Sequence, residues 1–130
     1  MQQAQRLSRY LEDELGECRS EDVQQRLDEL EELRSGSGVA AQFEQELDVL
    51  SALANETRYT LLRVLVAAEE ELCVCELNAV ADITESGLSH AMSTLVEADL
   101  VDGRKDGRWK TYRATNRAVA LVTMLEGCLE

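Results

Sequence analysis

Leucine and valine recur every three or four positions along most of the chain, which is the spacing of one apolar face of an α-helix. Before residue 35 this spacing predicts two short helices, one that ends near Gly16 to Cys18 and one over 21–34 with Ser20 as its N-cap. Their apolar positions are Leu7, Leu11, Leu15 and Cys18, then Val23, Leu27, Leu30 and Leu33. Neither helix has enough apolar area to be stable alone, so we expect a hairpin that packs on the main domain or on a second copy.

The helical spacing resumes after the Ser/Gly-rich stretch at 35–38. It predicts a helix through Phe43 and Leu53 that ends at Asn55, and then helices over 56–68, 74–80 and 85–98. The last two are joined by a turn at 82–84, and Thr84 is placed to cap the second of them, so they form a helix-turn-helix. We expect the inner face of the 85–98 helix to be formed by Leu88, Met92, Leu95 and Val96.

The pattern changes after residue 99 from helix to strand. Leu100-Val101 and Tyr112-Arg113 flank a basic stretch with the dipeptide Asp106-Gly107, which predicts a tight hairpin between two short strands. We expect Trp109 and Tyr112 to anchor this hairpin to the core. Thr115 can cap a final helix, whose apolar residues have no remaining domain to cover and therefore predict a dimer face: Val119, Val122, Met124 and Leu125.

Together these elements predict a mainly α fold with a small β-hairpin, that is, a dimeric winged helix-turn-helix. We expect an N-terminal helical extension at 1–34, a linker at 35–38 and a winged helix-turn-helix DNA-binding domain at 39–130. There is one histidine, no phosphate-cradling glycine loop and no nucleophile with a base at recognisable positions, so the sequence does not indicate an enzyme.

The chain is strongly acidic, with 26 acidic and 13 basic residues among 130 and a formal net charge of −13. Only two basic residues, Lys105 and Lys110, are lysines, a composition typical of halophiles, since molar salt shortens the Debye length to about 3 Å and screens self-repulsion. An ordinary acidic protein is the alternative. Neither a signal-peptide pattern nor a run of 18 apolar residues is present, which predicts a soluble, cytoplasmic protein with no membrane partner.

Positive charge gathers at the hairpin. Residues 100–130 hold 6 of the 13 basic residues and only 4 of the 26 acidic ones. Such a cluster is typical of an element that contacts nucleic-acid phosphates, although a solvated basic loop is the alternative. The cluster comprises Arg104, Lys105, Arg108, Lys110, Arg113 and Arg117.

Two of the four cysteines, Cys73 and Cys75, are separated by one residue at the start of the short helix predicted at 74–80. Neighbouring thiolates are soft donors that select thiophilic ions. Positions two residues apart lie about 200° around an ideal helix, so the pair can share one ion only if the first helical turn is distorted. The alternative is that both are small buried apolar residues.

Four stretches between Leu53 and Arg113 resemble, in the same order, the ArsR/SmtB family of winged-helix metal sensors. They are LANETRYTLLRVL, ELCVCEL, ESGLSHAMSTLVEADLV and DGRWKTYR, and the second is the most specific. The resemblance covers about half of the chain. It implies a homodimer that represses its own operon by binding double-stranded operator DNA and leaves the DNA when an inducer binds.

The resemblance also implies how the ion is held. Family members that sense arsenite through this helix often carry a third cysteine shortly after the pair, where this chain has Asn78. Trivalent arsenic takes three sulfur ligands and zinc or cadmium four, so Cys18 and Cys128 are the further candidate ligands. Relatives with a similar N-terminal extension supply thiols across the dimer, which favours Cys18 over Cys128.

Candidate DNA contacts lie on the outer face of the 85–98 helix and on the hairpin. On the helix they are Ser86, Gly87, Ser89, His90 and Ser93, and on the hairpin Arg104, Lys105, Arg108 and Lys110. His90 is alternatively a metal ligand, and Glu85 stands where the family commonly has a neutral amide.

The predicted function is a thiol-dependent transcriptional repressor that releases operator DNA on binding arsenite, antimonite, cadmium or zinc. No constitutive cofactor is expected. The alternatives are a redox-responsive regulator on the same scaffold, in which the thiols are oxidised, and an acidic protein-interaction module that has lost DNA binding.

Overall fold

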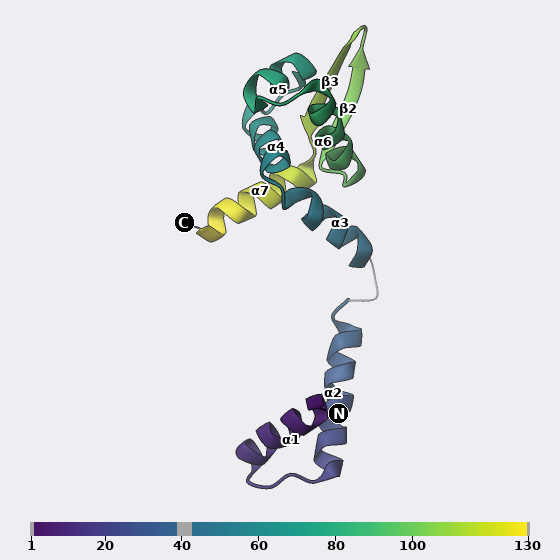
Figure 1. The fold of residues 1–130 in the computed structure, drawn as a ribbon, viewed down its shortest axis with the longest axis vertical. Coiled ribbons are helices and arrows are strands. Elements are labelled where there is room, and N and C mark those ends of the chain that lie inside the picture. Colours follow the sequence, from purple (N-terminus) through teal and green to yellow (C-terminus); the bar gives the residue numbers. More distant parts are fainter. Residues whose placement is uncertain (1, 39–42, 130) are drawn as a thin grey trace. The chain divides into compact units, whose positions relative to one another are not determined.

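The computed structural model describes residues 2–38 and 43–129, which form helices and a small sheet (Figure 1). Its contacts divide the chain into two compact units, Met1–Phe43 and Glu44–Glu130. The helices are α1 (Gln2–Leu15), α2 (Ser20–Gly36), α3 (Phe43–Leu53), α4 (Glu56–Ala68), α5 (Val74–Ala81), α6 (Glu85–Glu97) and α7 (Asn116–Leu129). The strands are β1 (Leu72–Cys73), β2 (Val101–Asp106) and β3 (Trp109–Ala114). In the described part of the chain no helix is both long enough and apolar enough to span a bilayer.

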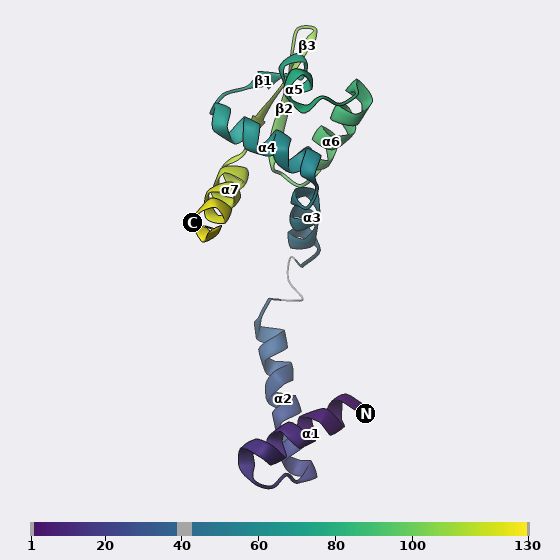
Figure 2. The ribbon, with the colours of Figure 1, turned by 60° about the vertical axis from the view of Figure 1, so that its left-hand side comes forward.

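The first unit is a helical hairpin of α1 and α2, as the spacing predicts (Figure 2). The prediction that Ser20 caps α2 is wrong by one residue, because Arg19 is the N-cap and its backbone N–H donates to the Asp22 carboxylate at 3.0 Å. Helix α2 continues to Gly36, two residues into the segment expected as a linker, and the domain division at 35–38 stays a prediction. Among the described side chains of this unit only that of Leu11 is buried, so its apolar residues form little core.

The second unit has a dense apolar core centred on α4. Leu61, Leu62 and Leu65 are fully buried there, together with leucines of α5 and α6. Helix α4 begins after Asn55, whose side chain accepts from the Arg58 backbone N–H at 3.0 Å. Two residues, Ala54 and Asn55, thus separate α3 from α4, and the sequence predicts this break at Asn55.

Helices α5 and α6 form the predicted helix-turn-helix. Asp82 ends α5 in the left-handed region, and the Thr84 hydroxyl accepts from the Gly87 backbone N–H at 3.0 Å. The inward side chains of α6 are Leu88, Ala91, Met92 and Leu95. The prediction that Val96 belongs to this face is wrong, since its side chain is 42% exposed. The core beyond Leu95 is completed instead by Ala98 and Leu100, which follow the helix.

The sheet is antiparallel with strand order β1-β3-β2. Its hairpin of β2 and β3, which we call the wing, turns through Gly107, the first of two loop residues, with a φ of +63° that suits glycine. Tyr112 is buried and anchors the wing to the core as predicted, and an added Cβ at Gly103 would lie 2.9 Å from its ring. The same prediction for Trp109 is wrong, because alternation along β3 turns this residue to the opposite face, where it is half exposed.

Helix α7 is capped as predicted, with the Thr115 hydroxyl accepting from the Ala118 backbone N–H at 3.3 Å. Val122 is buried in its own unit, so its assignment to the dimer face is wrong. Val119, Met124 and Leu125 remain exposed on this helix, and the dimer face formed by these three stays a prediction.

Candidate thiol site and nucleic-acid interface

Cys73 and Cys75 are joined by a disulfide in the structure, with their Cα atoms 5.4 Å apart. Cys73 is the N-cap of α5 and has an extended backbone, with φ −82° and ψ 162°, whereas Cys75 lies in the first turn. The 200° separation of an ideal helix therefore does not apply, because only one of the two residues is helical. The chain bends between them and turns both sulfurs to one side.

The thiol pair is tied to the sheet and to α5. Cys73 ends β1, where it lies opposite Thr111 of β3, and its backbone N–H donates to the Glu76 carboxylate at 3.0 Å. Cys73 is half-buried and Cys75 is exposed. The interpretation as two buried apolar residues therefore does not suit Cys75.

Further sulfur donors are not gathered around the pair. Within residues 2–38 and 43–129 there is no group of three or more His, Cys, Asp or Glu residues that could hold a metal ion. Cys128 is exposed near the end of α7. Cys18 belongs to the first unit, where it is half-buried in the turn between α1 and α2 and lies 3.6 Å from the Ser8 hydroxyl.

Asn78 occupies the position at which arsenite sensors often have a third cysteine. It lies one helical turn after Cys75, on the same side of α5. Its side-chain oxygen is buried and has no hydrogen-bond partner among the described residues. An amide oxygen is a hard donor, so the residue adds nothing to the soft character of the pair.

The outer face of α6 is polar and carries no lysine or arginine. Exposed positions include every candidate assigned to it: Ser86, Gly87, Ser89, His90 and Ser93. Glu85, at the first position of the helix, is exposed as well. Gly87 leaves room for the capping hydroxyl, because an added Cβ would lie 3.0 Å from the Thr84 oxygen. This face can therefore approach a groove with small side chains, but it offers no attraction to phosphates.

The wing supplies the positive charge, and its four candidate residues Arg104, Lys105, Arg108 and Lys110 are exposed. The Arg108 guanidinium stacks 5.1 Å from the Trp109 ring centroid, and the Lys110 ammonium lies 5.6 Å from that of Tyr112. These cation–π contacts hold two of the basic groups against the wing's aromatic rings.

Arg104 forms an ion pair that sequence reasoning missed. Its Nε donates to the Glu71 carboxylate at 2.6 Å, which raises the pKa of the guanidinium and lowers that of the Glu71 carboxyl. Glu71 lies two residues before Cys73 but 33 residues before Arg104. No local spacing could have revealed this pair.

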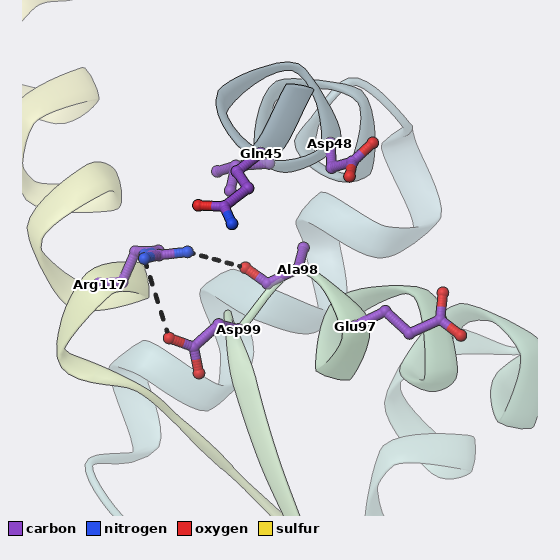
Figure 3. Close-up of a pocket in the computed structure, with 7 residues that line it drawn as sticks. Gln45, Asp48, Glu97, Ala98, Asp99 and Arg117 are labelled. Carbon is purple, nitrogen blue, oxygen red and sulfur yellow. Dashed lines mark hydrogen bonds and ion pairs between the residues drawn. The ribbon is translucent and has the colours of Figure 1, made fainter. Parts of the chain in front are cut away.

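The predicted basic cluster is divided in the structure. Arg117 lies at the start of α7, donates to the Ala98 carbonyl at 3.3 Å and lies 3.9 Å from the Asp99 carboxylate (Figure 3). Gln45 and Asp48 of α3 line the same pocket. Arg117 therefore fastens the end of α6 to α7 and does not belong to the wing.

Three comparisons agree with this architecture. The profile described as bacterial regulatory protein, arsR family, matches residues 45–102. A Halobacterium salinarum protein named as an arsenical resistance operon repressor is 53% identical over 98% of both chains. A second protein of that organism, named in the same way, is 42% identical over 62% of this chain and 68% of its own. The halophilic source of both relatives accords with the acid-rich, lysine-poor composition.

A solved structure shares the fold. The homodimeric winged helix-turn-helix DNA-binding domain of an ArsR-family regulator from Mycobacterium bovis superposes with a TM-score of 0.60 at 26% identity. The match covers 71% of this chain and 83% of that one.

Proposed function

Because the chain belongs to the arsR family of DNA-binding transcriptional regulators, we propose that it is a repressor that releases operator DNA when Cys73 and Cys75 bind a thiophilic ion. Proteins of this family bind operator DNA as homodimers and are not enzymes. The observation that carries the proposal is the convergence of the two sulfurs at the start of α5, the helix that leads directly into α6.

The link between thiols and DNA runs through α5. This helix has eight residues and one fully buried side chain, that of Leu77, which packs in the same core as Leu88 of α6. A soft ion held by both sulfurs fixes their separation and direction, and the pair spans the junction of β1 and α5. A change at this junction moves α5, and with it the support of α6, towards a conformation that fits DNA less well.

A trivalent arsenical is the inducer that the proposal favours, since both Halobacterium relatives carry arsenical resistance in their names. Antimonite has the same preference for thiolates, and cadmium or zinc are the divalent alternatives. Cys18, which is half-buried in the extension, is the proposed third ligand, and the match to the relative at 53% identity covers 98% of the chain. Cys128 is the alternative third ligand.

The test is operator binding by the full chain in multimolar potassium chloride, with its own upstream DNA and each of the four ions. Cys73→Ser/Cys75→Ser should bind DNA and ignore the ion that releases the wild type. Cys18→Ser should weaken the response and Cys128→Ser should leave it unchanged, and the reverse result would make Cys128 the third ligand. Wild-type DNA binding that no ion alters would overturn the proposal.

The contact between the sulfurs favours one second candidate, a redox-responsive repressor. The disulfide is the oxidised form of the pair, and closing it from two thiols transfers two electrons and two protons to an oxidant such as peroxide, which is reduced to water. Peroxide would then release the wild type from DNA, dithiothreitol would restore binding, and arsenite would have no effect on the reduced protein.

A further inference from the structure

One row of residues crosses the sheet from the thiol pair to the wing. Thr111 of β3 lies opposite Cys73 of β1 on one side and opposite Arg104 of β2 on the other. Residues directly opposite in antiparallel strands project to the same face. Cys73, Thr111 and Arg104 therefore share one face of the sheet, and Tyr112, the next residue along β3, is buried on the other.

Glu71 spans this row. Its carboxylate accepts from Nε of Arg104 at 2.6 Å, and the Thr111 hydroxyl lies 3.4 Å from its other oxygen. The Glu71 side chain is 30% exposed and that of Arg104 is 61% exposed. The carboxylate is thus partly enclosed between β1 and the wing, while the guanidinium extends towards solvent.

The geometry leaves Arg104 able to bind an anion. A guanidinium has five N–H donors, and in the described part of the chain the ion pair uses only the one on Nε. The two terminal amino groups form the fork that matches a phosphate. Glu71 thus fixes the orientation of the side chain without occupying the groups that would contact DNA.

We propose that Glu71 is a positioning residue that holds Arg104 ready for a DNA phosphate and couples the wing to the thiol pair. The inference rests on the proposed function for its second half, since the coupled event is ion binding at Cys73. Only Leu72 separates Glu71 from Cys73, so a shift of Cys73 in β1 moves the Glu71 carboxylate and loosens its hold on Arg104. Ion binding would in this way weaken the DNA contacts of the wing as well as those of α6.

The direction in which Glu71→Gln changes operator affinity distinguishes a positioning role from simple charge repulsion. Glu71→Gln removes a negative charge near DNA, which by itself would strengthen binding. A glutamine oxygen accepts from Arg104 without the charge that strengthens the bond, so weaker positioning predicts the opposite, roughly three- to tenfold weaker operator binding without any ion. Glu70→Gln is the matched control, because it removes the same charge from the neighbouring exposed position and should leave affinity equal or slightly higher.

A double-mutant cycle tests whether Glu71 acts through Arg104. Glu71→Gln/Arg104→Ala should bind no more weakly than Arg104→Ala alone. Arg104→Lys keeps the positive charge but lacks the Nε donor, so its operator binding should be weakened about as much as that of Glu71→Gln. It therefore tests the same interaction if Glu71→Gln folds poorly. Equal or tighter binding by Glu71→Gln, or additive losses in the double variant, would overturn the inference.

The coupling has its own readout. Where arsenite releases the wild type, the ratio of operator affinities without and with arsenite should be smaller in Glu71→Gln, while arsenite affinity for the thiols stays unchanged. If this ratio is as large in Glu71→Gln as in the wild type, the coupling is overturned and the proposed function stays intact. If none of the four ions releases the wild type from DNA, the proposed function fails, yet the effect of Glu71→Gln on ion-free binding still decides the positioning role.

Discussion

Helices α5 and α6 are the two halves of one helix-turn-helix, but the core holds them very differently. Helix α6 has four buried side chains over 13 residues, whereas α5 has one, Leu77, over eight. A helix with few buried contacts opens or shifts at lower free energy than a well-anchored neighbour. The thiols proposed to bind the ion therefore lie at the start of the helix with fewer buried side chains, and the predicted DNA contacts on α6 lie on the helix with more of them.

Leu77→Ala is expected to have the largest effect on the difference in stability between α5 and α6. It removes the one fully buried side chain of α5, so the free energy of unfolding should fall by about 2–5 kcal/mol. Urea unfolding at constant high salt measures the loss, and Val80→Ala, at a position of the same helix that is 54% exposed, should change it by less than about 0.5 kcal/mol. Amide hydrogen exchange should speed up in α5 before α6, and equal acceleration in both would contradict the comparison.

Asn78→Cys should sharpen the ion chemistry of α5 without altering α6. The new thiol lies one turn from Cys75 and replaces a buried oxygen that has no partner among the described residues. A third sulfur should tighten arsenite binding by on the order of tenfold or more, measured by competition with a dithiol. Ala79→Cys adds a thiol at an exposed position about 100° further around the helix and should give no such gain.

The predicted DNA contacts lie both on α6 and on the wing, and the two groups should contribute differently to operator binding. Ser89→Ala should change the preference for one base pair of the operator by about 1 kcal/mol and leave the salt dependence alone. Lys105→Gln should weaken binding to all sequences alike and lower the slope of log affinity against log salt by about one. A salt titration on operator and scrambled DNA measures both, and equal slopes for Lys105→Gln and the wild type would remove this residue from the phosphate contacts.

Elements with regular apolar spacing could be predicted from the sequence. Helix α4 begins and ends where the spacing predicts, and Thr84 caps α6 as expected, since both depend on residues close in the chain. Strand β1 was missed because two residues are too few to show alternation. Its pairing with β3, and the Glu71 to Arg104 ion pair, join segments more than 30 residues apart and leave no local pattern.

The convergence of the thiols is an intermediate case. In an ideal helix Cys73 and Cys75 would point in different directions, about 200° apart. The sequence therefore predicts that they share an ion only if the first helical turn is distorted. That condition is met because Cys73 belongs to β1, which tertiary pairing creates. The residue types thus predict the chemistry of the pair, which stays a prediction, whereas its geometry depends on a strand that the sequence does not reveal.

The smallest expected effect is on the pH dependence of stability, through the ion pair that joins Glu71 to Arg104 of the wing. Arg104 holds the pKa of the Glu71 carboxyl below its ordinary value of 4.5, so the folded state binds this proton less readily than the unfolded state. The stabilisation is complete above the ordinary pKa and is lost as the pH falls through the lowered one. Glu71→Gln should accordingly be slightly less stable than the wild type at neutral pH, and the gap should close on acidification. Carboxyl NMR titration with urea unfolding at each pH measures it, and a gap that persists in acid would mean that the Glu71 side chain stabilises this junction by packing rather than by charge.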